Sequence, residues 1–192
     1  MGRDSLLFVV SAPSGAGKTS LCKEVVNLVP DLHFSISYTA RPSRQHEVNG
    51  VDYHFVSLEE FQKMIDSGQM LEWTEIYGNF YGTPKASVEE CRSKGTDIIF
   101  DIDHLGARRI KEAYRDSVTI FILPPSHDEL KERLTQRGTD TEAVIKLRLE
   151  KASGEMKESN WYHYRIVNDE FEKAVAQLKE IIIAERMKKK DG

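Results

Sequence analysis

Cysteine is scarce in this chain, and the two that occur show no spacing typical of a metal site. Cys22 and Cys91 are far apart, and neither a CxxC pair nor a Cys/His pattern is present among the 192 residues. A disulfide framework and a zinc site of the usual spacing are therefore both excluded. We interpret the two cysteines as reduced core residues of a cytoplasmic protein.

Long apolar runs are also missing. No stretch approaches the roughly 20 apolar residues that cross a bilayer, and the first residues do not form a signal-peptide pattern. Leu6 stands where a myristoylation pattern requires Ser or Thr. The three lysines near the C-terminus are typical of a solvated helix end. We expect a soluble, cytoplasmic protein with no membrane partner.

An excess of positive charge is absent too. The 27 Lys and Arg are outnumbered by 31 Asp and Glu, which gives a net charge of −4. This balance argues against a broad basic surface for nucleic acid, although a small anionic ligand in a local basic pocket stays compatible with it. Hydrophobic residues make up 40% of the chain, enough for the core of one domain.

Short apolar runs alternate with amphipathic segments along most of the chain. Continuous runs rich in β-branched residues indicate buried parallel strands, and strand–helix alternation predicts an α/β fold with a doubly wound parallel sheet. The expected strands are 6–10, 97–102, 118–123 and 165–168, and the expected helices are 17–29, 84–94, 104–115, 126–137, 140–158 and 169–189.

Two segments interrupt this alternation. Residues 34–83 combine short strands, the turn Asn49-Gly50 and one helix near 57–67, which predicts a small mixed α/β insertion with hairpins. A pair of charged helices over 125–150 predicts a helical lid, because such excursions commonly move over a ligand. We therefore expect a single domain, with a core of 1–33, 84–124 and 151–192.

The segment SAPSGAGKTS, residues 11–20, resembles a phosphate-binding P-loop between a strand and a helix. Ala12 replaces the first glycine of the strict pattern, while Gly15 and Gly17 allow backbone N–H groups to surround phosphate. Lys18 would reach the β- and γ-phosphates, and Thr19 would hold Mg²⁺. The predicted ATP-binding residues are Ala12, Pro13, Ser14, Gly15, Ala16, Gly17, Lys18 and Thr19. An incidental glycine-rich turn is the less favoured alternative.

Two aspartates stand at the end of the predicted strand 97–102, at the edge of the sheet where the P-loop lies. Asp101 is placed to act on the metal ion through water, as an acidic residue after this strand does in P-loop enzymes. Asp103 precedes a helix, so it has a plain alternative role as the helix N-cap.

The two interrupting segments each carry arginines. The GTPase base-reading pattern N-K-x-D is absent, whereas Arg133, Arg137 and Arg148 occur in the predicted lid. Guanidinium groups can stabilise the charge on a transferring phosphoryl group. We therefore predict a catalytic set of Lys18 and these three arginines, although Arg133 could equally be an ordinary surface residue of a helix.

Together these segments resemble the guanylate kinase family over nearly the whole chain. The matching segments, in order, are SAPSGAGKTS, FSISYTARPSRQHEVNGVDYHF, EWTEIYGNFYGT, DID, FILPPS, RLTQRGTDTE and IVND. The resemblance implies transfer of a phosphoryl group from ATP, with Mg²⁺, to GMP or dGMP, by a monomer or a homodimer. It also implies GMP contacts from Ser37, Arg41, Arg44, Tyr53, Glu72, Tyr81, Thr83 and Asp103.

The chemistry of guanine agrees with the implied base contacts. Guanine presents N1–H and N2–H₂ side by side, which a carboxylate at Glu72 or Asp103 can accept, whereas adenine has an acceptor at N1. The hydroxyls of Ser37 and Thr83 can donate to guanine O6.

Arg41 and Arg44, with the hydroxyls of Tyr53 and Tyr81, would hold the phosphate of GMP. Ala40 and His46 depart from the family pattern, in which Thr and Gly are common. We interpret His46 as a solvent-facing loop residue.

Two other functions share these features. One is a guanylate-kinase-like module that binds protein partners and has lost catalysis, although such modules typically degrade the P-loop that is kept here. The other is a kinase of the same build that acts on a different small phosphate ester. Turnover of GMP, compared with AMP, UMP and CMP, distinguishes the three.

Overall fold

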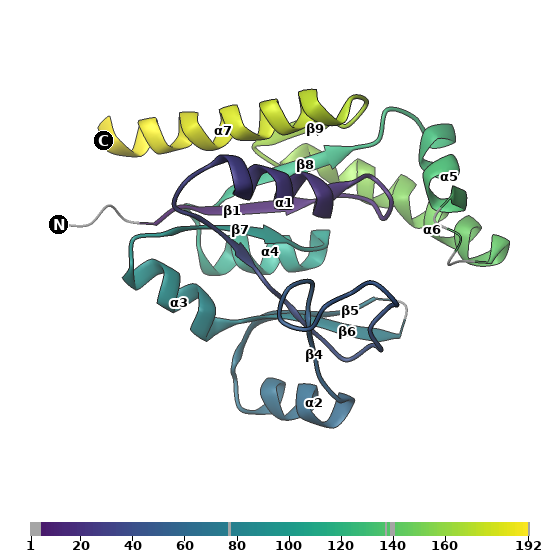
Figure 1. Cartoon of the computed structure of the whole chain (residues 1–192), viewed down its shortest axis with the longest axis horizontal. Coiled ribbons are helices and arrows are strands. Elements are labelled where there is room, and N and C mark those ends of the chain that lie inside the picture. Colours follow the sequence, from purple (N-terminus) through teal and green to yellow (C-terminus); the bar gives the residue numbers. More distant parts are fainter. Residues whose placement is uncertain (1–4, 77, 137, 139–140, 192) are drawn as a thin grey trace.

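A computed structural model describes residues 5–76, 78–136, 138 and 141–191. Its core is a parallel five-stranded sheet in the order β2-β7-β1-β8-β9 (Figure 1). The strands are β1 (Leu7–Ser11), β2 (Leu32–Ser35), β7 (Asp97–Asp101), β8 (Val118–Leu123) and β9 (Tyr164–Val167). The α/β fold with a parallel central sheet is thus confirmed.

Helices cover both faces of this sheet, because every residue of β1 is buried although successive side chains point to opposite faces. Phe8 and Val10 pack against the face with α1 (Lys18–Leu28) and α7 (Phe171–Asp191), and Leu7 and Val9 pack on the other face. That second face is covered by α3 (Lys85–Ser93) and α4 (His104–Ala113). Burial on both faces explains why the strands are continuous apolar runs.

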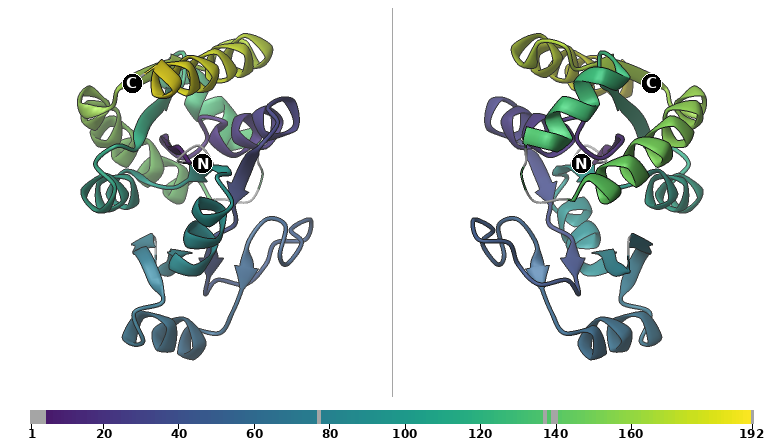
Figure 2. Two further views of the ribbon diagram at one scale, coloured as in Figure 1. Left: turned by 90° about the vertical axis from the view of Figure 1, so that its left-hand side faces the viewer. Right: turned by 90° about the vertical axis from the view of Figure 1, so that its right-hand side faces the viewer.

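The insertion forms a second, mixed sheet in the order β4-β3-β6-β5, below the core in Figures 1 and 2. Its elements are β3 (Tyr38–Thr39), β4 (His54–Phe55), α2 (Leu58–Asp66), β5 (Met70–Ile76) and β6 (Asn79–Pro84). The β5–β6 hairpin is antiparallel, and its register pairs Glu72 with Thr83. Ser57 caps α2 by accepting the N–H of Glu60 at 3.1 Å.

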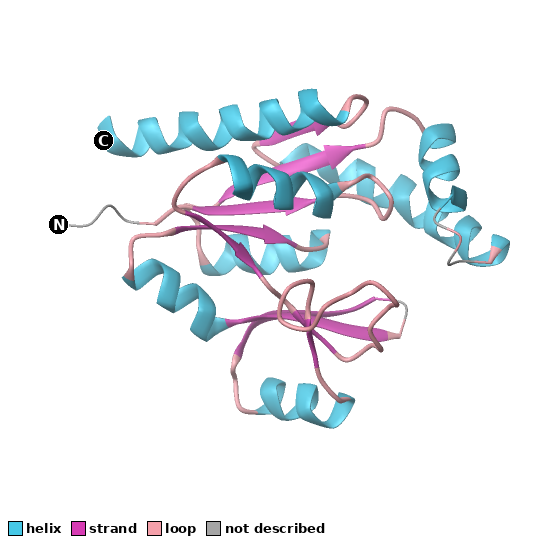
Figure 3. Ribbon diagram, viewed as in Figure 1, coloured by secondary structure: helices cyan, strands magenta, loops and turns pink. Residues whose placement is uncertain are grey.

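The segment predicted to be a lid contains two helices at one end of the sheet, α5 (His127–Gln136) and α6 (Glu142–Lys157) (Figure 3). A short 3₁₀-helix, η1 (Glu158–Trp161), follows them. Helices α5 and α6 pack through a small apolar cluster of their own that includes Leu130, Leu134 and Ile145. No helix in the described part of the chain is long and apolar enough to span a membrane.

The expected boundaries of the insertion and of the lid each fall inside one element of the structure. β2 continues to Ser35 and pairs with β7, so the core sheet extends past residue 33, where the sequence placed the start of the insertion. The expected end of the lid at residue 150 falls inside α6, which is one continuous helix.

Candidate active site

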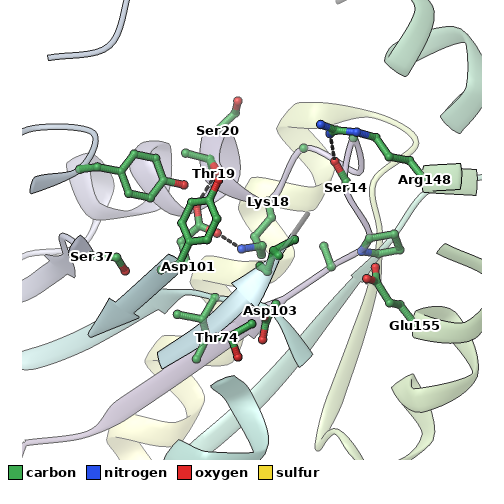
Figure 4. Close-up of a pocket in the computed structure, with 18 of the residues that line it drawn as sticks. Ser14, Lys18, Thr19, Ser20, Ser37, Thr74, Asp101, Asp103, Arg148 and Glu155 are labelled. Atoms are coloured by element: carbon green, nitrogen blue, oxygen red, sulfur yellow. Dashed lines mark hydrogen bonds and ion pairs between the residues drawn. The ribbon is translucent and has the colours of Figure 1, made fainter. Parts of the chain in front are cut away.

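A cleft of about 440 Å³ lies between the P-loop, the insertion and the lid helices (Figure 4). All predicted site residues line it except Ala16, Thr83 and Arg137. Ala16 and Thr83 are fully buried beside it, and Arg137 lies outside the described residues. The structure therefore brings segments distant in sequence to one place.

The P-loop backbone depends on two glycines. Gly15 and Gly17 have φ of 93° and 89°, in the left-handed region that residues with a Cβ rarely adopt. The N–H of Ala16 donates to the carbonyl of Pro13 at 3.1 Å, which closes the turn before α1. Ala12 is not among the positive-φ residues, so its backbone does not need the glycine of the strict pattern.

Asn168, just after β9, braces the P-loop through a hydrogen bond. Its Nδ2 donates to the carbonyl of Ala16 at 2.8 Å, and its own N–H donates to Leu123 O at 2.8 Å. A Cβ built on Gly17 would lie 2.4 Å from this Nδ2, so the contact also requires a glycine. The sequence reasoning assigned no role to Asn168, although it lies in the quoted IVND segment.

Lys18, Thr19 and Asp101 form one cluster at the carboxyl ends of β1 and β7. The ammonium of Lys18 and the hydroxyl of Thr19 each donate to a different oxygen of Asp101 (Figure 4). A hydroxyl and a carboxylate are the hard oxygen ligands that Mg²⁺ prefers. Among the described residues, no group of three or more His, Cys, Asp or Glu could hold a metal ion.

The described lid arginines reach the cleft in different ways. Arg148 of α6 donates to the Ser14 hydroxyl at 2.7 Å, which joins the lid to the P-loop. Arg133 of α5 donates to Glu129 at 2.9 Å and to the carbonyl of Asn168 at 3.0 Å. Arg133 therefore supports the brace as well as lining the cleft.

Glu72 is a carboxylate buried in the wall of the cleft, with only 5% of its surface exposed. Thr83, opposite on β6, donates its hydroxyl to Glu72 Oε1 at 2.6 Å. Burial raises the pKa of Glu72 to about 7; the Thr83 hydrogen bond lowers it and the nearby Asp103 carboxylate raises it. Because a buried carboxylate is costly when its oxygens lack hydrogen-bond partners, it is stabilised most by a ligand that offers two hydrogen-bond donors.

Asp103 is the N-cap of α4, as the alternative interpretation predicted. Its Oδ1 accepts the N–H of Gly106 at 2.7 Å, and the residue still lines the cleft. Capping therefore fixes its direction without removing it from the site.

Arg41 is the centre of a basic cluster in the insertion and is only 8% exposed. Its guanidinium pairs with both oxygens of Glu47, at 2.6 and 2.5 Å, and its Nε donates to the Tyr81 hydroxyl at 3.1 Å. It also lies over the Tyr53 ring, 5.1 Å from the centroid. The Glu47 carboxylate further accepts the backbone N–H of Arg44 at 2.8 Å. The sequence reasoning gave Glu47 no role.

Glu155, contributed by α6, is a carboxylate in the cleft that sequence reasoning missed. Burial raises its pKa to about 7, with a further contribution from Asp103. Nothing in the local sequence distinguishes it from the other charged residues of that helix, and only packing brings it to the site.

Comparisons with known proteins agree with this geometry. The family model described as guanylate kinase matches residues 4–185. The guanylate kinase of Geobacter metallireducens is 52% identical over 97% of this chain and 92% of its own length. That of Symbiobacterium thermophilum is 46% identical over 94% and 86%. The crystal structure of guanylate kinase from Anaplasma phagocytophilum superposes with a TM-score of 0.82 at 32% identity, over 97% of this chain and 89% of that one. This chain belongs to the guanylate kinase family.

Proposed function

We propose that this chain transfers the γ-phosphoryl group of ATP to GMP, and also to dGMP, giving ADP and GDP. The observation that carries the proposal is one cleft that holds both a P-loop and a buried carboxylate beside an arginine cluster. The P-loop suits a triphosphate. The buried carboxylate and the arginines together suit a guanine nucleotide with one phosphate. We further propose that the enzyme acts in the cytoplasm, as a monomer or a homodimer.

The P-loop side binds ATP in this proposal. The N–H groups around Gly15 and Gly17 surround the phosphates at the start of α1, where the helix dipole favours an anion. Thr19 and Asp101 would hold Mg²⁺, Asp101 through water, and the ion would neutralise phosphate charge when bound. Lys18 exchanges its Asp101 partner for phosphate oxygens.

The insertion reads the base. Glu72 accepts N1–H and N2–H₂ of guanine, with Asp103 beside it. The Thr83 hydroxyl donates its single proton to Glu72, so its main role is to orient that carboxylate. Ser37, buried in the cleft wall, then supplies the donor for O6.

The basic cluster holds the GMP phosphate. Glu47 fixes the Arg41 guanidinium through two hydrogen bonds, so Arg41 loses little side-chain entropy on binding. The Tyr53 and Tyr81 hydroxyls and the half-exposed Arg44 complete the phosphate contacts.

Phosphoryl transfer then needs no nucleophilic side chain. An oxygen of the GMP phosphate attacks the γ-phosphorus of ATP in line, and the chain contributes position and charge. Lys18 and Arg148 neutralise charge on the transferring group, and we keep Arg133 and Arg137 as further candidates. Closure of the lid over the cleft would exclude water, which would otherwise compete as acceptor.

Product analysis tests the proposal. Incubation with ATP, Mg²⁺ and GMP should yield ADP and GDP in equal amounts, and omission of GMP should leave ATP intact. A chain that binds GMP without forming GDP would be a binding module instead.

The raised pKa of Glu72 predicts a pH-dependent affinity for GMP. Guanine donors require the carboxylate form, and a group with a pKa of about 7 is mostly ionised at pH 8 and mostly protonated at pH 6. The KM for GMP should therefore rise about tenfold between pH 8 and pH 6. In Glu72→Gln, whose amide does not titrate, only the weaker pH dependence from Glu155 and from the nucleotide phosphate should remain. An equal pH dependence in the variant would contradict this role.

Removal of the Asn168 brace should weaken ATP binding selectively. Asn168→Ala deletes the hydrogen bond to the Ala16 carbonyl and leaves a buried acceptor without its partner. Such a loss corresponds to about 1–3 kcal/mol, so the KM for ATP should rise about tenfold in steady-state kinetics. The KM for GMP should change less than about twofold, as expected for a substitution that is distant from the GMP site and shares no partner with it. Equal changes in both would show general loss of structure.

A further inference from the structure

Gly106, in the first turn of α4, lies directly against the base-reading carboxylate. A Cβ built on Gly106 would be 2.7 Å from Glu72 Oε2 and 3.1 Å from Glu72 Cδ. Real Cβ atoms essentially never come as close to another atom as 2.7 Å. The space occupied by the Glu72 carboxylate therefore exists only because residue 106 has no side chain.

The backbone at this position does not itself require glycine. Gly106 is not among the residues with positive φ, and in a helix alanine is a better former than glycine. Its N–H donates to Oδ1 of Asp103, the N-cap of α4, and any residue except proline would donate the same hydrogen bond. What only glycine provides here is the missing Cβ.

The same Cβ would hardly disturb Asp103. Its distance to Asp103 Oδ1 would be 3.4 Å, at the edge of ordinary van der Waals contact. Of these two carboxylates, only that of Glu72 would clash with a Cβ at residue 106.

If residue 106 had a Cβ, the Glu72 carboxylate would move away and α4 would stay in place. Ala107 and Ile110, on the same helix, are fully buried in the core, so α4 cannot retreat without opening a cavity. The Glu72 carboxylate is the end of a side chain with several rotatable bonds, and the Thr83 hydroxyl holds one of its oxygens.

We propose that Gly106 is a positioning residue for guanine recognition: by lacking a Cβ, it lets Glu72 take the orientation that accepts the two guanine donors. This inference rests on the proposed function. Its prediction is that Gly106→Ala displaces the carboxylate and reduces the affinity for GMP, while the fold and the ATP site stay intact.

The test compares Gly106→Ala with Gly154→Ala, a matched control. Gly154 also lies in a helix, α6, but a Cβ there would meet nothing within 4 Å. In steady-state assays Gly106→Ala should raise the KM for GMP at least about tenfold, the effect of losing one hydrogen bond to a charged group. The KM for ATP should stay unchanged and the melting temperature should not fall, and Gly154→Ala should match the parent chain in both KM values without lowering the melting temperature.

A double-mutant cycle separates positioning from a general packing defect. If Gly106 acts through Glu72, then adding Gly106→Ala to Glu72→Ala should change the KM for GMP less than about twofold. The inference would be overturned if Gly106→Ala raised the KM for GMP by the same factor in the parent chain and in Glu72→Ala. It would also be overturned if Gly106→Ala alone left that KM unchanged. If instead the parent chain forms no GDP, the proposed function itself fails.

Discussion

Replacing Lys18 by Met should lower kcat about 10³-fold, the upper range for removal of one preorganised charge-stabilising donor. Lys18 follows the two left-handed glycines of the P-loop and lies in the cleft, paired with Asp101. Met retains much of the side-chain length and apolar stem but has no charge. The loss should appear in kcat in a coupled assay with saturating ATP and GMP.

Lys173→Met provides the control for this substitution. Lys173 is also ion-paired, to Glu170 at 2.6 Å, but it lies on the exposed surface of α7 away from the cleft. Its kcat should match that of the parent chain. Turnover by Lys18→Met within about tenfold of the parent would mean that Lys18 is not the main charge-neutralising group.

The second large effect concerns Glu72. Glu72→Gln should lower kcat/KM for GMP by about 100-fold, because the amide loses the charge and directs an N–H₂ toward the guanine donors. The KM for ATP should stay within about twofold of the parent, as expected for a site without shared contacts. Because burial disfavours the ionised form of Glu72, the amide should not lower the melting temperature at pH 8.

Glu75→Gln is the matched control in the same strand. Glu75 lies three residues after Glu72 in β5, so its side chain points to the opposite face of the strand, where it is exposed. Its replacement should therefore leave kcat/KM for GMP unchanged. Equal losses for ATP and GMP in Glu72→Gln would contradict the assignment of Glu72 to the base.

The core of the fold could be predicted because its signals are local. β1, β7 and β8 are buried on both faces and therefore read as continuous apolar runs. β2 was not predicted as part of the core sheet. It lies at the sheet edge with His33 exposed, and its short alternating pattern looks like the strands of the insertion that follows.

Residues that line the cleft could be anticipated where charge or glycine marks a motif, as at Lys18 and Arg41, whereas Glu72 was placed there by the family resemblance alone. The supporting residues could not be anticipated, because their roles arise only from contacts between distant segments. Asn168 touches the P-loop more than 150 positions away in sequence, and Gly106 matters only because α4 packs against β5. Composition and spacing contain no record of such packing.

The central claim is specific transfer from ATP to a guanine monophosphate, and kcat/KM across monophosphates tests it most directly. The experiment supplies ATP, Mg²⁺ and, in turn, GMP, dGMP, AMP, UMP and CMP, and measures the ADP formed. GMP and dGMP should be phosphorylated at least about 10³-fold more efficiently than AMP, because adenine leaves Glu72 without its two donors. No turnover of GMP, or equal turnover of GMP and AMP, would contradict the account.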